Sequence, residues 1–132
     1  MTYAEFVETT RAKLSTRWDN ELHMILGLTT EIGELATIYK EFLGYNKPMD
    51  DINIQEELGD ILFYIQGLCN INGYTLDSII QKNVQKLTAR YPQEFTEEDA
   101  LNRNLERERE VLEQDTYTDL TSDVIKEILE KE

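Results

Sequence analysis

Apolar residues recur every three or four positions along most of the chain, and short stretches rich in Gly, Pro, Asn and Asp interrupt them. This spacing gathers apolar side chains on one face of an α-helix. It predicts helices over residues 3–18, 21–43, 51–71, 75–91, 96–114 and 121–130. Since no segment shows the two-residue alternation of a half-buried strand, the pattern predicts an all-α protein.

Candidate caps and stops mark the ends of these helices. A short polar side chain at an N-cap accepts a hydrogen bond from the first turn of the helix. The expected caps are Asp19 or Asn20, Asp50 or Asp51, and Thr96, and the expected stops are Gly44, Asn72-Gly73 and Tyr91-Pro92. Trp18, the single tryptophan, falls at the end of the first predicted helix. We expect it to pack into the core or an interface, or else to stack on a nucleobase.

Three central helices each have an apolar face that we expect to point into the core. These faces consist of Leu28, Ile32, Leu35, Tyr39 and Phe42, of Ile54, Leu58, Ile61, Ile65 and Leu68, and of Leu76, Ile79, Ile80, Val84 and Leu87. The last two predicted helices are interpreted as a docking or oligomerisation arm rather than as catalytic parts.

One eight-residue pattern occurs twice, at residues 28–35 and 54–61. Both copies read apolar, two variable residues, Glu, apolar, Gly, acid, apolar. The two acids of each copy stand one helical turn apart, beside the apolar face. A glycine in mid-helix costs about 1 kcal/mol relative to Ala. Its repetition as Gly33 and Gly59 therefore predicts that two antiparallel helices cross closely at these glycines.

The predicted crossing brings together four carboxylates, those of Glu31, Glu34, Glu57 and Asp60. Ionised carboxylates at one place repel one another unless they bind a counter-charge or take up protons. Oxygen ligands suit Mg²⁺ or Mn²⁺ rather than Zn²⁺, and such ions leave positions for phosphate oxygens. The alternative is that these acids lie on a solvated helix face, as most Glu residues do.

Further candidate residues follow the acidic pairs. Asn83, Lys86 and Arg90 share one face of the fourth predicted helix. An amide, an ammonium and a guanidinium on one face of a helix can together bind an anion. The alternative is that this face is simply exposed to solvent, since polar residues at such a face have the same spacing. Tyr64 lies one turn after Asp60, so its phenol either reaches the acidic cluster or lies at its rim.

Composition narrows the class of protein. With 132 residues, 40% of them hydrophobic, the chain fits one domain with a real core. A net charge of −14 argues against binding to a nucleic-acid polymer, which needs a basic surface. No apolar run approaches the ~20 residues of a membrane span. The single cysteine, Cys69, and an N-terminal segment without signal-peptide character predict a cytoplasmic protein.

Three motifs in order resemble the all-α nucleoside triphosphate pyrophosphohydrolases, a MazG-like group with the related dCTP pyrophosphatases and dimeric dUTPases. They are Gly27-Leu28-x-x-Glu31-Ile32-Gly33-Glu34, Glu56-Glu57-Leu58-Gly59-Asp60, and Asn83-x-x-Lys86-Leu87 with Arg90-Tyr91-Pro92. The resemblance covers about residues 20–95 and is greatest toward small MazG-like proteins of bacteria and phages. It implies a four-helix MazG-like bundle core over residues 1–95, followed by a helical C-terminal extension over residues 96–132.

The resemblance also implies Mg²⁺-dependent cleavage of a nucleoside triphosphate between its α and β phosphates, carried out by a dimer or tetramer. The implied metal ligands are Glu31, Glu34, Glu57 and Asp60. Glu34 or Glu31 would in addition take a proton from the attacking water. The residues expected to contact substrate are Tyr64, Asn83, Lys86 and Arg90, with Trp18 as a candidate for base stacking.

Two other classes of function stay open. A regulatory or adaptor bundle would bind Mg²⁺-nucleotide or a protein partner without turnover, and the intact set of acids argues against it. A storage bundle for Mg²⁺ or Ca²⁺ fits the acidity but leaves the stripe of Asn83, Lys86 and Arg90 without a purpose.

Overall fold

The computed structural model describes residues 1–114, and its regular elements are all helices. They are α1 (Tyr3–Thr10), α2 (Arg17–Tyr45), α3 (Asp51–Asn72), α4 (Leu76–Arg90), α5 (Glu97–Leu101) and α6 (Leu105–Glu113). This part of the chain is 77% helical and contains no strand, so the predicted all-α class is confirmed. The helix predicted over residues 121–130 lies outside the described residues.

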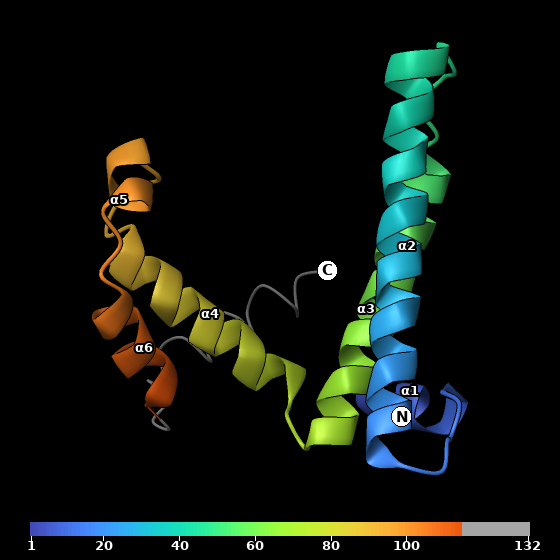
Figure 1. The fold of residues 1–132 in the computed structure, drawn as a ribbon, viewed down its shortest axis with the longest axis horizontal. Helices are drawn as coiled ribbons and strands as arrows, with labels where there is room; N and C mark the ends of the chain where they lie inside the picture. The colour runs from blue at the N-terminus through green and yellow to red at the C-terminus, as the bar shows by residue number, and fades with distance from the viewer. Residues whose placement is uncertain (115–132) are drawn as a thin grey trace. The chain divides into compact units, whose positions relative to one another are not determined.

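The chain divides into two compact units, with the boundary between Thr75 and Leu76. The first unit contains α1, α2 and α3, and the second contains α4, α5 and α6. Figure 1 shows α2 and α3 side by side as an antiparallel hairpin. Between residues 1 and 114, no helix is both long enough and apolar enough to cross a membrane.

Local capping explains the ends of the two hairpin helices. Asp50 accepts a hydrogen bond from the backbone N–H of Asn53 and so caps α3. Gly73 ends the same helix with a φ of 71°, and both ends agree with the sequence prediction. α2 instead continues past Gly44, the predicted stop, and ends at Asn46 with a φ of 53°. Asn tolerates this left-handed conformation because its short polar side chain can hydrogen-bond locally.

The prediction of one helix over residues 3–18 is wrong, because the chain is extended between α1 and α2. Arg11 leaves the helical region with a ψ of 151°. Thr16, rather than Asp19 or Asn20, caps α2 by accepting from a backbone N–H of the first turn. Trp18 therefore belongs to the first turn of α2 and not to the end of the first helix.

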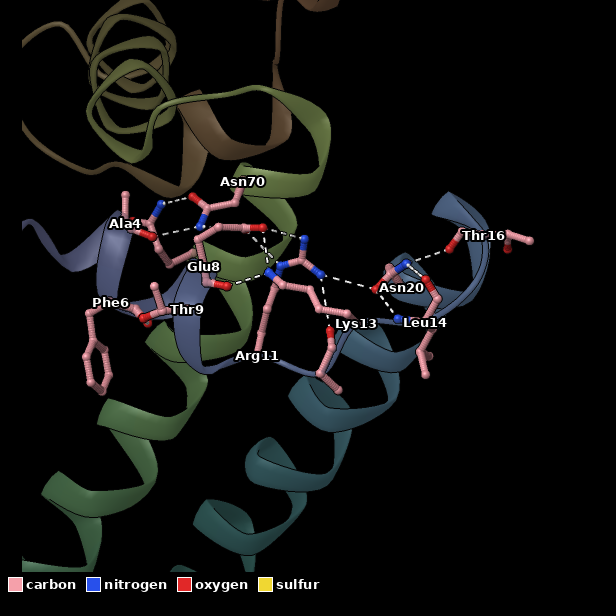
Figure 2. A network of polar contacts seen from close by, with 12 residues as sticks. Ala4, Phe6, Glu8, Thr9, Arg11, Lys13, Leu14, Thr16, Asn20 and Asn70 are labelled. Atoms are coloured by element: carbon pink, nitrogen blue, oxygen red, sulfur yellow. Dashed lines mark hydrogen bonds and ion pairs between the residues drawn. The ribbon is translucent and has the colours of Figure 1, made fainter.

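A polar network ties α1 to both long helices (Figure 2). Asn70 of α3 donates to the carbonyl oxygen of Ala4 at 2.9 Å and to Glu8 Oε2 at 3.3 Å. Arg11 donates to both carboxylate oxygens of Glu8 at 2.9 Å and to Asn20 Oδ1 at 3.1 Å. The hydrogen bond from Arg11 is the largest cause that lowers the pKa of Glu8 to about 2. The network therefore holds α1 and the following loop against the hairpin.

The hairpin has a single antiparallel register. The pairs that face each other across it are Met24 with Gly67, Gly27 with Tyr64, Glu31 with Asp60, and Glu34 with Glu57. Each step of three or four residues forward along α2 is matched by an equal step backward along α3. The register consequently places the first acid of one motif opposite the second acid of the other.

The closest approaches of the two helices occur at glycines that the sequence pattern did not select. A Cβ at Gly27 would lie 2.1 Å from Tyr64 Cε1, and a Cβ at Gly67 would lie 2.5 Å from Met24 Sδ. Both distances are far below van der Waals contact, so these two positions require glycine as long as the facing side chains stay where they are.

The predicted close crossing at Gly33 and Gly59 is wrong. A Cβ added at either glycine would meet no atom within 4 Å. Ile32 and Leu58, two predicted core residues, are 51% and 47% exposed. The hairpin is therefore rotated, relative to the prediction, so that the acidic stripe faces inward.

The seam between α2 and α3 is lined by residues at alternating steps of three and four. They are Met24, Leu28, Glu31, Leu35 and Ile38 on α2, and Ile54, Glu57, Ile61, Tyr64 and Leu68 on α3, all of them buried or partly buried. Several other predicted core residues are more than a third exposed, namely Tyr39, Phe42, Ile79, Ile80, Val84 and Leu87.

In the second unit, α6 packs against α4 (Figure 1). The single helix predicted over residues 96–114 is interrupted, because α5 ends at Leu101 and α6 begins after Asn104. Asn104 caps α6 by accepting from the backbone N–H of Arg107, and Thr96 caps α5 as predicted. Among the described residues after position 96, α6 is thus a packing partner of α4.

Candidate metal centre

Three carboxylates meet between α2 and α3. One oxygen each from Glu31, Glu57 and Asp60 lies within 4.8 Å of the other two. Glu57 is only 6% exposed, Glu31 is partly exposed and Asp60 is exposed. The cluster is therefore closed toward the seam and open to solvent on the other side.

Glu34 borders the same cluster from the solvent side. Burial raises the pKa of Glu31 to about 7, and the charge of Glu34 is the next largest cause. Burial, followed by the charge of Glu34, also raises the pKa of Glu57. The structure thus brings together the four acids of the doubled motif, and their mutual repulsion favours protonated forms in the absence of a cation.

The buried carboxylate of Glu57 tests whether the cluster fits a metal ion. Its Oε2 is buried and has no hydrogen-bond partner within residues 1–114. Leaving such an oxygen unpaired is unfavourable unless a proton or a cation relieves it. Since every donor is a carboxylate oxygen, the set formed by Glu31, Glu57 and Asp60 suits a hard divalent cation such as Mg²⁺ or Mn²⁺.

The local sequence explains why the acids face inward. Glu31 and Glu57 occupy seam positions that apolar residues normally fill in a pair of packed helices. Glu34 and Asp60 follow them by one turn and lie at the solvent edge of the seam. The packing of the hairpin therefore buries Glu57 and partly buries Glu31, while Glu34 and Asp60 remain accessible to a ligand.

Residues 19–95 match the MazG nucleotide pyrophosphohydrolase domain. The matched range contains α3, α4 and all four acids of the cluster. The chain belongs to the MazG nucleotide pyrophosphohydrolase domain family. Membership confirms the resemblance found in the sequence.

One similar protein is the Gene 37 protein of Mycobacterium phage L5, which is 32% identical over 72 residues. The match covers 52% of this chain and 63% of that relative, so the MazG-family chain spans less than two thirds of the relative's length. No solved structure matches the chain significantly.

Tyr64 lies one turn along α3 from Asp60. Its ring lies against Gly27 of α2 and meets Phe63 edge-on, with ring centroids 5.4 Å apart. The ring thus fills the seam directly beside the MazG-family acids. This position is compatible with a contact to substrate, which remains a prediction.

Trp18 is separated from the acids along α2. Trp18 and Glu31 belong to one continuous helix, so a rise of 1.5 Å per residue separates their Cα atoms by about 20 Å. The Trp18 side chain is 71% exposed, and the Arg17 guanidinium lies 5.2 Å from its ring centroid. The expectation of a core position is wrong for this single chain. Base stacking on Trp18 stays a prediction.

The predicted anion-binding residues lie on α4 in the second unit. Asn83 is exposed and Lys86 is partly exposed. Arg90 is engaged by another helix, because its Nε and Nη2 donate to Glu108 of α6 at 2.7 and 2.9 Å. The sequence does not predict this role of Glu108, since nothing in the charged sequence of α6 distinguishes it from its acidic neighbours.

Tyr3 of α1 is a second residue near the acids that the sequence does not predict. Burial, followed by the charge of Asp60, raises the pKa of its phenol. The phenol therefore lies within electrostatic reach of the acidic cluster. Its ring stacks on Phe6, with centroids 6.4 Å apart. Only the packing of α1 against α3 brings Tyr3 to this position, so no local pattern could have signalled it.

Proposed function

We propose that this protein is a Mg²⁺-dependent nucleoside triphosphate pyrophosphohydrolase. It would cleave a nucleoside or deoxynucleoside triphosphate between the α and β phosphates, which releases the nucleoside monophosphate and pyrophosphate. The observation that carries this proposal is a buried oxygen of Glu57 that has no hydrogen-bond partner among residues 1–114, within the carboxylate cluster of a MazG-family chain. A single buried cysteine fits a reducing compartment, and we propose the cytoplasm as the location.

Glu31, Glu57 and Asp60 would hold the Mg²⁺, or Mn²⁺ in its place, and Glu34 would complete the site. The bound ion would supply positive charge against the triphosphate and lower the pKa of a water molecule. Because the seam closes the inner side of the cluster, substrate would approach from the exposed side at Glu34 and Asp60.

Glu34 or Glu31 is the proposed acceptor of the proton from the attacking water. Glu34 lies on the solvent side of the cluster, where a water molecule can enter. Glu31 lies deeper, and in the metal-free protein its pKa is raised to about 7 by burial and by the charge of Glu34. Both candidates remain in the proposal.

Asn83, Lys86 and Arg90 are the proposed phosphate-binding residues. The chain has 13 basic against 27 acidic residues, so cations on one helical face stand out against an acidic background. Their charge would stabilise the negative charge that develops on the leaving pyrophosphate. Tyr64 would contact the substrate beside the cluster, and Trp18 would stack on a base held by a second copy.

We further propose that the active form is a dimer or tetramer. The apolar side chains exposed along one face of α2 and on adjoining α3 are Trp18, Leu22, Ile25, Ile32, Tyr39, Leu43, Leu58 and Leu62. Soluble monomers rarely expose an apolar patch of this size. The exposed area is on the order of the ~800 Å² that each partner of a standard interface buries. Since Ile32 and Leu58 adjoin the acids, a second copy would cover the surface beside the cluster.

Pyrophosphate release from a panel of canonical and modified nucleoside triphosphates tests the proposed activity. We expect release with Mg²⁺ and none with excess EDTA. Binding of Mg²⁺-nucleotide without any release would favour the regulatory bundle instead. Sedimentation at micromolar concentration tests the assembly, and a species of only 15.5 kDa would contradict it.

A further inference from the structure

The first turns of α1 present a stacked pair of aromatic rings at the surface of the first unit. The ring centroids of Tyr3 and Phe6 lie 6.4 Å apart, with 16° between the ring planes. Tyr3 is 44% exposed and Phe6 is 46% exposed, whereas Val7, one turn after Tyr3, is fully buried. The pair therefore stands at the edge of the contact between α1 and the hairpin, with part of its ring surface open to solvent.

Hydrogen bonds hold α1 on one face of α3. Asn70 Nδ2 donates to the carbonyl oxygen of Ala4 at 2.9 Å, and a capping box between Thr2 and Glu5 orders the start of α1. The side chain of Phe6 points away from Asn70, toward the preceding turns of α3 (Figure 2). The backbone that carries the aromatic pair is thus fixed against the hairpin.

The same face of α3 leads from Asn70 toward the acidic cluster. Phe63 lies two helical turns before Asn70, and Asp60 lies one turn further. The charge of Asp60 contributes, after burial, to the raised pKa of the Tyr3 phenol, which agrees with an aromatic pair that extends along this face toward the acids. Asp60 is the exposed member of the cluster on α3. The rings therefore border the side of the cluster that is open to solvent.

The aromatic pair and the four acids belong to one compact unit, Met1–Thr75. Their placement relative to each other is therefore set within a single folded body. Because α1 precedes residues 19–95, which match the family, membership of the family assigns no role to these two rings.

We propose that the stacked rings of Tyr3 and Phe6 bind the nucleobase of the nucleoside triphosphate whose phosphates lie at the acids. The inference rests on the proposed function and names the surface that holds the base. Every nucleobase has a flat face that stacks on an aromatic ring. The phosphates carry the negative charge that a cation at the acids binds, so base and phosphates would occupy adjoining surfaces of the same unit.

Two other roles would also account for the exposed rings. They would only anchor α1 on α3, or they would contact a second copy of the chain. The position beside Asp60 favours the base, because Ile32 and Leu58, which are also exposed beside the acids, are aliphatic and offer no ring for stacking. The three roles predict different effects when one ring is replaced by an aliphatic side chain.

The test compares full-length Tyr3→Leu and Phe6→Leu with Tyr3→Phe, and Tyr45→Leu is the matched control. Leu keeps an apolar side chain on α1 but has no ring, whereas Phe keeps the ring and loses only the hydroxyl. Tyr45 is an exposed tyrosine at the end of α2, about 20 Å along that helix from Glu31. KM and kcat are measured for each nucleoside triphosphate that the wild type cleaves. The inhibition constant is measured for Mg²⁺-tripolyphosphate, which has no base. All measurements are made well below the melting temperature of each variant.

We expect Tyr3→Leu to raise KM roughly tenfold for every nucleotide, with little change in kcat. Phe6→Leu should also raise KM. The inhibition constant of tripolyphosphate should keep its wild-type value in both variants, because the acids that hold the cation are unchanged. Tyr3→Phe and the Tyr45→Leu control should behave as the wild type.

Three results would overturn the proposal. The first is an unchanged KM in Tyr3→Leu. The second is a parallel rise in the inhibition constant of tripolyphosphate, which would show that the rings only support the shape of the acidic cluster. The third is a smaller species in sedimentation of Tyr3→Leu than of the wild type, which would assign the rings to the contact with a second copy.

If the wild type releases no pyrophosphate from any nucleotide, the proposed function fails separately. Calorimetric titration with the Mg²⁺ complexes of the canonical nucleoside triphosphates and of tripolyphosphate then decides the inference. Tighter binding of a nucleotide than of tripolyphosphate, with the difference lost in Tyr3→Leu, supports it. A difference that persists in Tyr3→Leu, equal binding of both ligands by the wild type, or no binding overturns it.

Discussion

Tyr64 of α3 lies directly against Gly27 of α2, where the Cβ of any other residue would come within 2.1 Å of the ring carbon Cε1. One helical turn separates Tyr64 from Asp60, and one turn separates Gly27 from Glu31. The contact therefore fixes the register that places Glu31 opposite Asp60. Gly27 takes no part in the chemistry, yet the geometry of the carboxylate cluster depends on it.

Replacing Gly27 by Ala should destabilise the hairpin by about 1–3 kcal/mol, because a methyl group would overlap a packed aromatic ring. Gly33→Ala in the same helix should stabilise it by about 0.5–1 kcal/mol, since its Cβ has open space and Ala is the better helix former. Gly67→Ala should cost less than Gly27→Ala, because the flexible Met24 side chain that it meets can move. Urea unfolding followed by circular dichroism measures all three. Equal stabilities of the Gly27 and Gly33 variants would refute the register.

Neutralising the cluster should separate stability from activity. Glu57→Gln and Asp60→Asn should abolish pyrophosphate release while preserving the helical spectrum. In the absence of divalent metal, Glu57→Gln should also raise the melting temperature, because it removes like-charge repulsion at a buried position. Glu56→Gln, at the preceding exposed position, is the control and should retain activity. Hydrolysis at the wild-type rate by Glu57→Gln would show that the metal site is wrongly assigned.

The metal-free protein should lose stability as pH rises. The pKa of Glu31 is raised from 4.5 to about 7 in the folded state, so folded protein holds a proton that unfolded protein has released. The free energy of unfolding must then fall as pH rises from 4.5 to about 7. Above about pH 7, the stability that the bound proton of Glu31 contributes is lost. Added Mg²⁺ should stabilise the protein most at the high-pH end of this range, because the carboxylates must be deprotonated to bind the ion. Melting temperatures across this range, with EDTA and with Mg²⁺, measure both effects. A flat metal-free profile would contradict the raised pKa of Glu31, which burial and then the charge of Glu34 cause.

Lys86→Ala should weaken catalysis for every base alike, because the triphosphate is common to all substrates. A charge-assisted contact to phosphate is worth about 1.5–3 kcal/mol, so kcat/KM should fall roughly 10- to 150-fold. Lys82→Ala, one turn earlier on α4, serves as the control. Trp18→Ala should instead change the ranking among bases if its ring stacks on the base in a second copy. An unaltered kcat/KM in Lys86→Ala would show that the face of α4 with Asn83, Lys86 and Arg90 is an ordinary solvent-exposed face without a role in phosphate binding.

The sequence by itself determined the features that depend on neighbours along the chain. Helical periodicity predicts the all-α class, and local turn chemistry predicts the ends of α3 at Asp50 and Gly73. The spacing within each acidic motif predicts that its two acids share one helix face, and the structure brings both pairs together. These features could be predicted from the sequence because hydrogen bonds and steric limits within a few residues decide them.

Only the tertiary structure decided which faces of α2 and α3 meet. Apolar residues cover more than one stripe of each helix, so periodicity alone leaves the rotation of the helix about its axis undetermined. Steric contact between Gly27 and Tyr64 selects the rotation that buries Glu57, partly buries Glu31 and exposes Ile32.

The tertiary structure also decided that Arg90 pairs with Glu108, 18 residues later in the chain. It likewise brings Tyr3 into electrostatic reach of Asp60. Each depends on where a distant helix packs, and that position follows from the free energy of the whole assembled unit rather than from any local pattern.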